Sequence, residues 1–142
     1  MTMILDASMA LAWLIVRADA TEAALASRAF VEVQSTGAHV PALWFAEVAN
    51  TLLVFERAKR LNEADSTNYL ADVALLAITA DDLPFATALP RCLSLGRGYN
   101  LSAYDSTYLE LAMRRSGVLA TFDRKLAEAA RKVGVQVFGD PI

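Results

Sequence analysis

The stretch LSAYDSTYLELAMRRSGVLATFDRKL, residues 101–126, decides the fold because it contains a helix, a strand and the start of a second helix. Ser102 is suited to cap the first helix, and Gly117 is suited to end it. Residues 118–121 (VLAT) predict a short buried strand, and Asp123 then caps the next helix. Helices and strands that alternate with such short connections predict a parallel sheet covered by helices on both faces.

Outward from this stretch, the rest of the chain continues the same alternation. Further strands are expected at residues 2–6 (TMILD), 38–41 and 135–138. Further helices are expected from Ser8 to about Val16, over 20–35, from Pro41 to about Arg60, from Asn62 or Asp65 to about Ile78, and from Pro90 to about Tyr99, with a connection at 81–85. We therefore predict an α/β fold in which helices cover both faces of a short, mostly parallel central sheet. A length of 142 residues fits one domain over 1–142.

Composition narrows the class of protein. Hydrophobic residues make up 56% of the chain, but Arg17, Glu32, Glu47 and Glu56 interrupt the most apolar stretches, so no membrane span is expected. The single Cys92 excludes an internal disulfide and a thiolate zinc cluster. No basic leader precedes the first apolar run. These features together predict a cytoplasmic protein.

Basic residues gather in four short groups, although the net charge is −3. The groups are Arg57 with Lys59 and Arg60, Arg114–Arg115, Arg124–Lys125 and Arg131–Lys132. Because the whole chain is acidic, any binding of nucleic acid must depend on these local groups. The simpler interpretation of each group is a solvated helix face.

Four acidic residues lie at positions where a ligand-binding or catalytic site is expected. Asp6 and Asp123 each follow a predicted strand, and ligands of parallel sheets bind beyond the carboxyl ends of the strands. Glu47 lies in the apolar stripe of its helix with no Lys or Arg one turn away, so its carboxylate needs a donor or a cation. Asp105 follows Ser102 by three residues, as the second acid of a capping box would.

Each acid also has a purely structural interpretation. Asp6 could be a turn residue, and Glu47 could lie at the edge of the apolar stripe of its helix and reach water. Asp105 and Asp123 could be helix caps. As a set, however, the four carboxylates supply the hard oxygen ligands that suit Mg²⁺ or Mn²⁺. A histidine-rich zinc site and a Ser–His triad are not expected, because His39 is the only histidine. Nucleotide binding is not expected either, because no glycine-rich phosphate loop is present.

Three segments that contain these acids resemble, in order, the PIN-domain ribonucleases, and within them the VapC-like toxins of type II toxin–antitoxin pairs. The segments are ILDASMALAWL, PALWFAEVANTL and LSAYDSTYLELAMRRSGVLATFDRKL. The resemblance covers nearly the whole chain and implies a PIN-like three-layer α/β/α sandwich. It also implies a Mg²⁺- or Mn²⁺-dependent endoribonuclease whose metal-site and catalytic acids are Asp6, Glu47, Asp105 and Asp123. Ser8, Asn50 and Thr121 are then supporting polar groups.

The same resemblance implies an RNA substrate, a small VapB-like antitoxin and a homodimer. We expect the helices beginning at Pro41 and Asn62 to form a groove for an inhibitor helix, and the last helices to supply the dimer contact. Two alternatives remain, a housekeeping PIN nuclease for RNA maturation and a non-catalytic PIN-like binding protein. A haloacid-dehalogenase-like phosphatase is disfavoured because Ser8 stands where that class has a second Asp.

Overall fold

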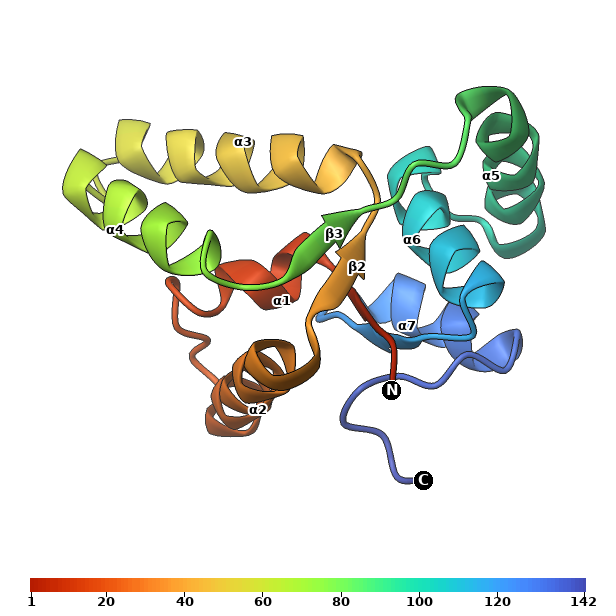
Figure 1. Ribbon diagram of the computed structural model, residues 1–142, viewed down its shortest axis with the longest axis horizontal. Coiled ribbons are helices and arrows are strands. Elements are labelled where there is room, and N and C mark those ends of the chain that lie inside the picture. The colour runs from red at the N-terminus through yellow and green to blue at the C-terminus, as the bar shows by residue number, and fades with distance from the viewer.

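The computed structural model describes residues 1–142 and has at its centre a four-stranded sheet in the order β3-β2-β1-β4 (Figure 1). The strands are β1 Met3–Leu5, β2 Ala38–Val40, β3 Ile78–Ala80 and β4 Val118–Ala120, and every pair is parallel. Parallel neighbours require crossover connections, which the intervening helices provide.

Seven helices surround this sheet. They are α1 Ala7–Leu11, α2 Ala20–Thr36, α3 Leu43–Arg57, α4 Glu63–Val73, α5 Phe85–Tyr99, α6 Ala103–Arg114 and α7 Arg124–Lys132. Figure 1 shows the strands between one group, α1 to α4, and a second group, α5 to α7. The predicted three-layer α/β/α arrangement is therefore confirmed. None of these helices is long and apolar enough to cross a membrane.

The centre of the core is β1, which pairs with β2 on one side and β4 on the other. Met3, Ile4 and Leu5 are all buried, as expected for a strand covered on both faces. The register pairs Leu5 with Ala120, so the residues that follow β1 and β4 emerge side by side at the same edge. This edge receives Asp6 and Thr121.

Two helix starts differ from the sequence prediction. The predicted cap of the first helix was Ser8, but Asp6 holds the N-cap position and α1 ends at Leu11. The Ser8 hydroxyl is occupied by contacts with Asp6 and with the backbone N–H of Phe122, so it does not cap the helix. Helix α5 begins at Phe85, five residues before the predicted start at Pro90, and Pro90 lies inside it with the loss of one backbone donor.

The outermost strands also differ from the prediction. Residues 78–80 were expected as a helix end and a connection, but they form the edge strand β3, and α4 ends already at Val73. Being at the edge, β3 is partly exposed and lacks the buried apolar run of a central strand. The predicted strand Val135–Phe138 is reduced to a single parallel bridge between Val137 and Leu119.

Candidate active site

Asp6 is fixed where β1 ends. Its backbone N–H donates to the Ala120 carbonyl at 3.0 Å, continuing the sheet ladder by one residue. Its Oδ2 accepts hydrogen bonds from the Ser8 and Thr121 hydroxyls, both at 2.6 Å. Only 6% of the residue is exposed. Two hydroxyl donors from separate segments, Ser8 and Thr121, therefore orient a buried carboxylate.

Burial raises the pKa of Asp6, because a buried carboxylate loses hydration. The Ser8 and Thr121 hydrogen bonds oppose that rise by stabilising the ionised form, and the charge of Asp123 adds to it. The two hydroxyls thus partly offset an environment that disfavours the ionised form of Asp6.

Asp123 begins α7 and acts as its cap, as the sequence predicted. Its Oδ1 accepts from the Leu126 backbone N–H at 2.9 Å, and its own N–H donates to the Thr121 hydroxyl at 2.9 Å. Thr121 therefore connects Asp6 to the backbone of Asp123. Because capping occupies Oδ1, Oδ2 is the oxygen left for another ligand.

Glu47 reaches the same region from α3, where it is partly buried. Its Oε1 accepts a 2.6 Å hydrogen bond from the Tyr108 hydroxyl. Asn50, the predicted orienting group, is exposed and makes no hydrogen bond with Glu47. Sequence analysis did not identify Tyr108, although its position one turn after Asp105 in an apolar helix was a usable signal, since a buried phenol needs a partner.

Asp105 lies in the first turn of α6. Its backbone N–H donates to the Ser102 hydroxyl at 3.1 Å, which confirms Ser102 as the cap. Burial, together with the charges of Asp123 and Asp6, raises the pKa of the Asp105 carboxyl to about 6, and Lys125 opposes this rise. The side chain therefore lies close enough to both other acids to be repelled by them.

Glu47 belongs to the same electrostatic group. Burial raises its pKa, the hydrogen bond from Tyr108 lowers it, and the charges of Asp6 and Asp105 raise it. In their present positions no three acidic side chains surround one point closely enough to bind a metal ion. A cation would have to draw them closer together. The donor set is nevertheless suitable, because carboxylate oxygens are the ligands that Mg²⁺ and Mn²⁺ prefer.

Two surface hollows are lined in part by residues that contact Asp6. One, of about 550 Å³, is lined by Ser8, Thr51, Phe55 and residues of the segment after α1. The other, of about 410 Å³, includes Thr121 and Asp123 in its lining. Asp123 is thus the one acid of the four that lines either hollow.

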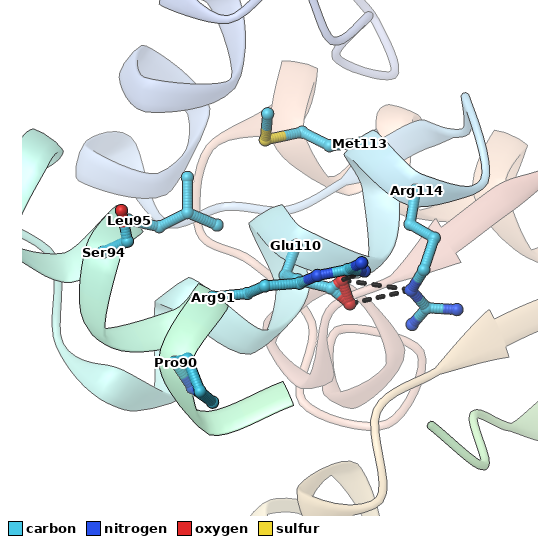
Figure 2. A pocket seen from close by; sticks show the side chains of 7 residues that line it. All are labelled: Pro90, Arg91, Ser94, Leu95, Glu110, Met113 and Arg114. Carbon is cyan, nitrogen blue, oxygen red and sulfur yellow. Dashed lines mark hydrogen bonds and ion pairs between the residues drawn. The ribbon is translucent and has the colours of Figure 1, made fainter. Parts of the chain in front are cut away.

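A further pocket of about 540 Å³ lies elsewhere, between α5 and the C-terminal half of α6 (Figure 2). Its buried Glu110 is already bound by Arg114 at 2.8 Å, and Arg114 is in turn bound to Asp81. Arg91 approaches the same carboxylate at 4.0 Å. Because these charges are paired with one another, the pocket is best explained as part of the structural packing of α5 on α6.

Comparisons with known proteins agree with this arrangement. A profile of the PIN domain family matches residues 3–132. Ribonuclease VapC3 from Pyrobaculum aerophilum is 32% identical over 128 residues, which are 90% of this chain and 94% of that protein. A solved structure from the same organism has a TM-score of 0.66 at 21% identity, covering 90% of this chain and 84% of its own.

Two further solved structures have a similar fold. FitAcB from Neisseria gonorrhoeae has a TM-score of 0.62 at 20% identity and 96% coverage of both chains. A toxin–antitoxin complex from Klebsiella pneumoniae has a TM-score of 0.64 at 15% identity and 98% coverage of both. At such low identity these structures support only the fold. Membership of a family rests on the family profile, which covers most of the sequence. The chain belongs to the PIN domain family.

Proposed function

We propose that this protein is a Mg²⁺- or Mn²⁺-dependent endoribonuclease that acts as the toxin of a toxin–antitoxin pair. The observation that supports this most is the mutual repulsion of Asp6, Glu47, Asp105 and Asp123 at one edge of the sheet. No Lys or Arg forms an ion pair with any of them. Such an arrangement is unfavourable unless a cation is bound.

In this proposal the four carboxylates hold the metal, and the Ser8 and Thr121 hydroxyls orient Asp6. When bound, the metal offsets the charge of the scissile phosphate and lowers the pKa of a water that attacks it. The chain itself orients the ligands, and hydrolysis leaves a 5′-phosphate and a 3′-hydroxyl.

Binding of the RNA backbone is assigned to Arg124 and Lys125. Both are exposed at the start of α7, directly after Asp123, and neither forms an ion pair. Two other basic groups differ because Arg114, Arg115 and Arg131 are already paired with carboxylates, and the group Arg57, Lys59 and Arg60 lies at the far end of α3 from Glu47. Two free cations beside an acidic centre provide local attraction for phosphates in a protein of negative net charge.

The toxin assignment is supported by the similarity to ribonuclease VapC3 and by a structural neighbour described as a toxin–antitoxin complex. A surface for an antitoxin is available on α3 and α4, where Phe45, Leu53, Val54 and Leu70 are exposed. We assign this surface to the apolar face of a small antitoxin helix. A housekeeping nuclease would instead lack a neighbouring gene for a small DNA-binding protein and would not arrest growth.

The direct test is cleavage of single-stranded RNA by protein stripped of metal, before and after addition of Mn²⁺. We expect cleavage only with Mn²⁺ and none by Asp6→Asn in either condition, with products that carry 5′-phosphates. Full cleavage in EDTA, or unchanged cleavage by Asp6→Asn, would contradict the proposal. Growth arrest on expression without the upstream neighbour separates a toxin from a housekeeping enzyme.

A further inference from the structure

Tyr108 is the one side chain from the buried core that contacts a candidate ligand from another helix. The residue is 0% exposed, so packing fixes its ring. Its hydroxyl donates to Glu47 Oε1 at 2.6 Å across 61 residues of sequence. Glu47 has several rotatable torsions and no ion pair, and therefore depends on this one contact for its orientation.

The position of Tyr108 in the fold also connects the elements that contain the other acids. It lies in α6 three residues after Asp105, so both project from neighbouring turns of one helix. Its hydroxyl oxygen lies 3.4 Å from the backbone nitrogen of Ala7, the residue after Asp6. One phenol thus touches the start of α1 and Glu47 of α3, from the helix that bears Asp105.

We infer that Tyr108 is a positioning residue that presets Glu47 for the metal ion, using its hydroxyl to hold Oε1 and leaving Oε2 for the cation. This inference depends on the proposed metal-dependent function. Hydrogen bonds from a neighbouring side chain to a ligand commonly decide how tightly a site binds its metal. Here the donor is a rigid aromatic group, so it restricts a flexible glutamate without adding a competing charge.

A second buried tyrosine provides a matched control. Tyr69 is 6% exposed, and its hydroxyl donates to the backbone carbonyl of Ala10 at the same distance, 2.6 Å. Its acceptor is a backbone group of α1 and not a candidate ligand. Replacing either tyrosine by phenylalanine therefore removes a hydrogen bond of equal length, but only Tyr108→Phe affects Glu47, and it also removes the longer contact with the Ala7 N–H.

The test measures Mn²⁺ affinity by calorimetry for the wild type, Tyr108→Phe, Tyr69→Phe, Glu47→Gln and the double variant Tyr108→Phe/Glu47→Gln. We expect Tyr108→Phe to stay folded and to bind Mn²⁺ about tenfold more weakly. Tyr69→Phe should bind within about twofold of the wild type, and Tyr108→Phe should add less than about twofold to the loss in Glu47→Gln.

Each other outcome has a definite meaning. Wild-type affinity in Tyr108→Phe, an equal loss in Tyr69→Phe, or a full additional loss in the Glu47→Gln background would each overturn the positioning role. Failure of Tyr108→Phe to fold would also overturn it, because the hydroxyl would then be a structural group. Absence of Mn²⁺ binding by the folded wild type would instead contradict the proposed metal-dependent function.

Discussion

At the scale of single residues, Asp105 and Asp123 each lie at the start of a helix, and each also lies close to other carboxylates that repel it. Asp123 caps α7 through Oδ1, and Asp105 follows the Ser102 cap of α6. Asparagine caps a helix about as well as aspartate does, so Asp→Asn changes the charge and preserves the cap. This substitution therefore separates a structural role from a role in metal binding.

We predict that Asp105→Asn and Asp123→Asn lose RNA cleavage while their melting temperatures in EDTA stay equal to or rise above the wild-type value. The loss of one charge reduces repulsion among Asp6, Asp105 and Asp123. The checks are thermal unfolding in EDTA and cleavage in Mn²⁺. Near-normal cleavage by either variant would remove that residue from the site.

The raised pKa of Asp105 gives a pH-dependent prediction. Its pKa is about 6 in the folded protein against an ordinary value of 3.8, so the folded state keeps a proton that the unfolded chain has lost. The resulting stabilisation is complete below pH 3.8 and is lost as the pH rises through about 6. In EDTA, the melting temperature of Asp105→Asn relative to the wild type should therefore increase over this interval. A pH-independent difference would contradict the shifted pKa.

At the scale of elements, α6 separates two groups of charges. Asp105 lies in its first turn, whereas Arg114, in its last, binds Glu110 and Asp81. Nine residues of helix place the two ends about 13 Å apart along the axis. The buried ion pairs therefore belong to the packing of the fold and not to the acidic site.

We predict that Arg114→Ala lowers the free energy of unfolding by about 3 kcal/mol, because it leaves the buried Glu110 without its main partner. Mn²⁺ affinity of the folded variant should stay within about twofold of the wild type, since distant sites act independently. Urea unfolding and calorimetry measure the two quantities. A large loss of Mn²⁺ affinity would show that the two ends of α6 are coupled.

The elements also show what sequence alone can predict. Strands β1, β2 and β4 were predictable because they are mostly buried and, apart from His39, consist of apolar residues. Edge strand β3 was missed because its partly exposed residues lack that signal. Local rules identified the caps Ser102 and Asp123, whereas Tyr108 was missed because its contact with Glu47 spans 61 residues of sequence.

At the scale of the whole molecule, exposed apolar residues occur both on α3 and α4 and on α5. The predicted dimer contact on the last helices fits α7 poorly, because its apolar residues are buried and its exposed face is charged. Helix α5 is better suited, since Phe85, Leu89 and Leu93 are spaced by four residues and all exposed. We therefore place the proposed two-fold contact on α5.

We predict that the wild type is a dimer by light scattering at micromolar concentration and that Leu89→Asp is a monomer. Leu75→Asp is the control, because Leu75 is 86% exposed and lies outside α5. A charge in the middle of an apolar self-complementary contact is repelled by its own copy across the two-fold axis. A dimer that persists in Leu89→Asp, or one lost equally in Leu75→Asp, would exclude α5 as the contact.

The central claim is that acids from four separate segments bind one metal centre. Its most direct test is a crystal structure with Mn²⁺, with diffraction measured at the manganese absorption edge. The account predicts an anomalous peak at the carboxyl edge of β1 and β4, in direct contact with oxygens of at least three of Asp6, Glu47, Asp105 and Asp123. No peak there at saturating Mn²⁺, or a peak only at other carboxylates, would contradict the account.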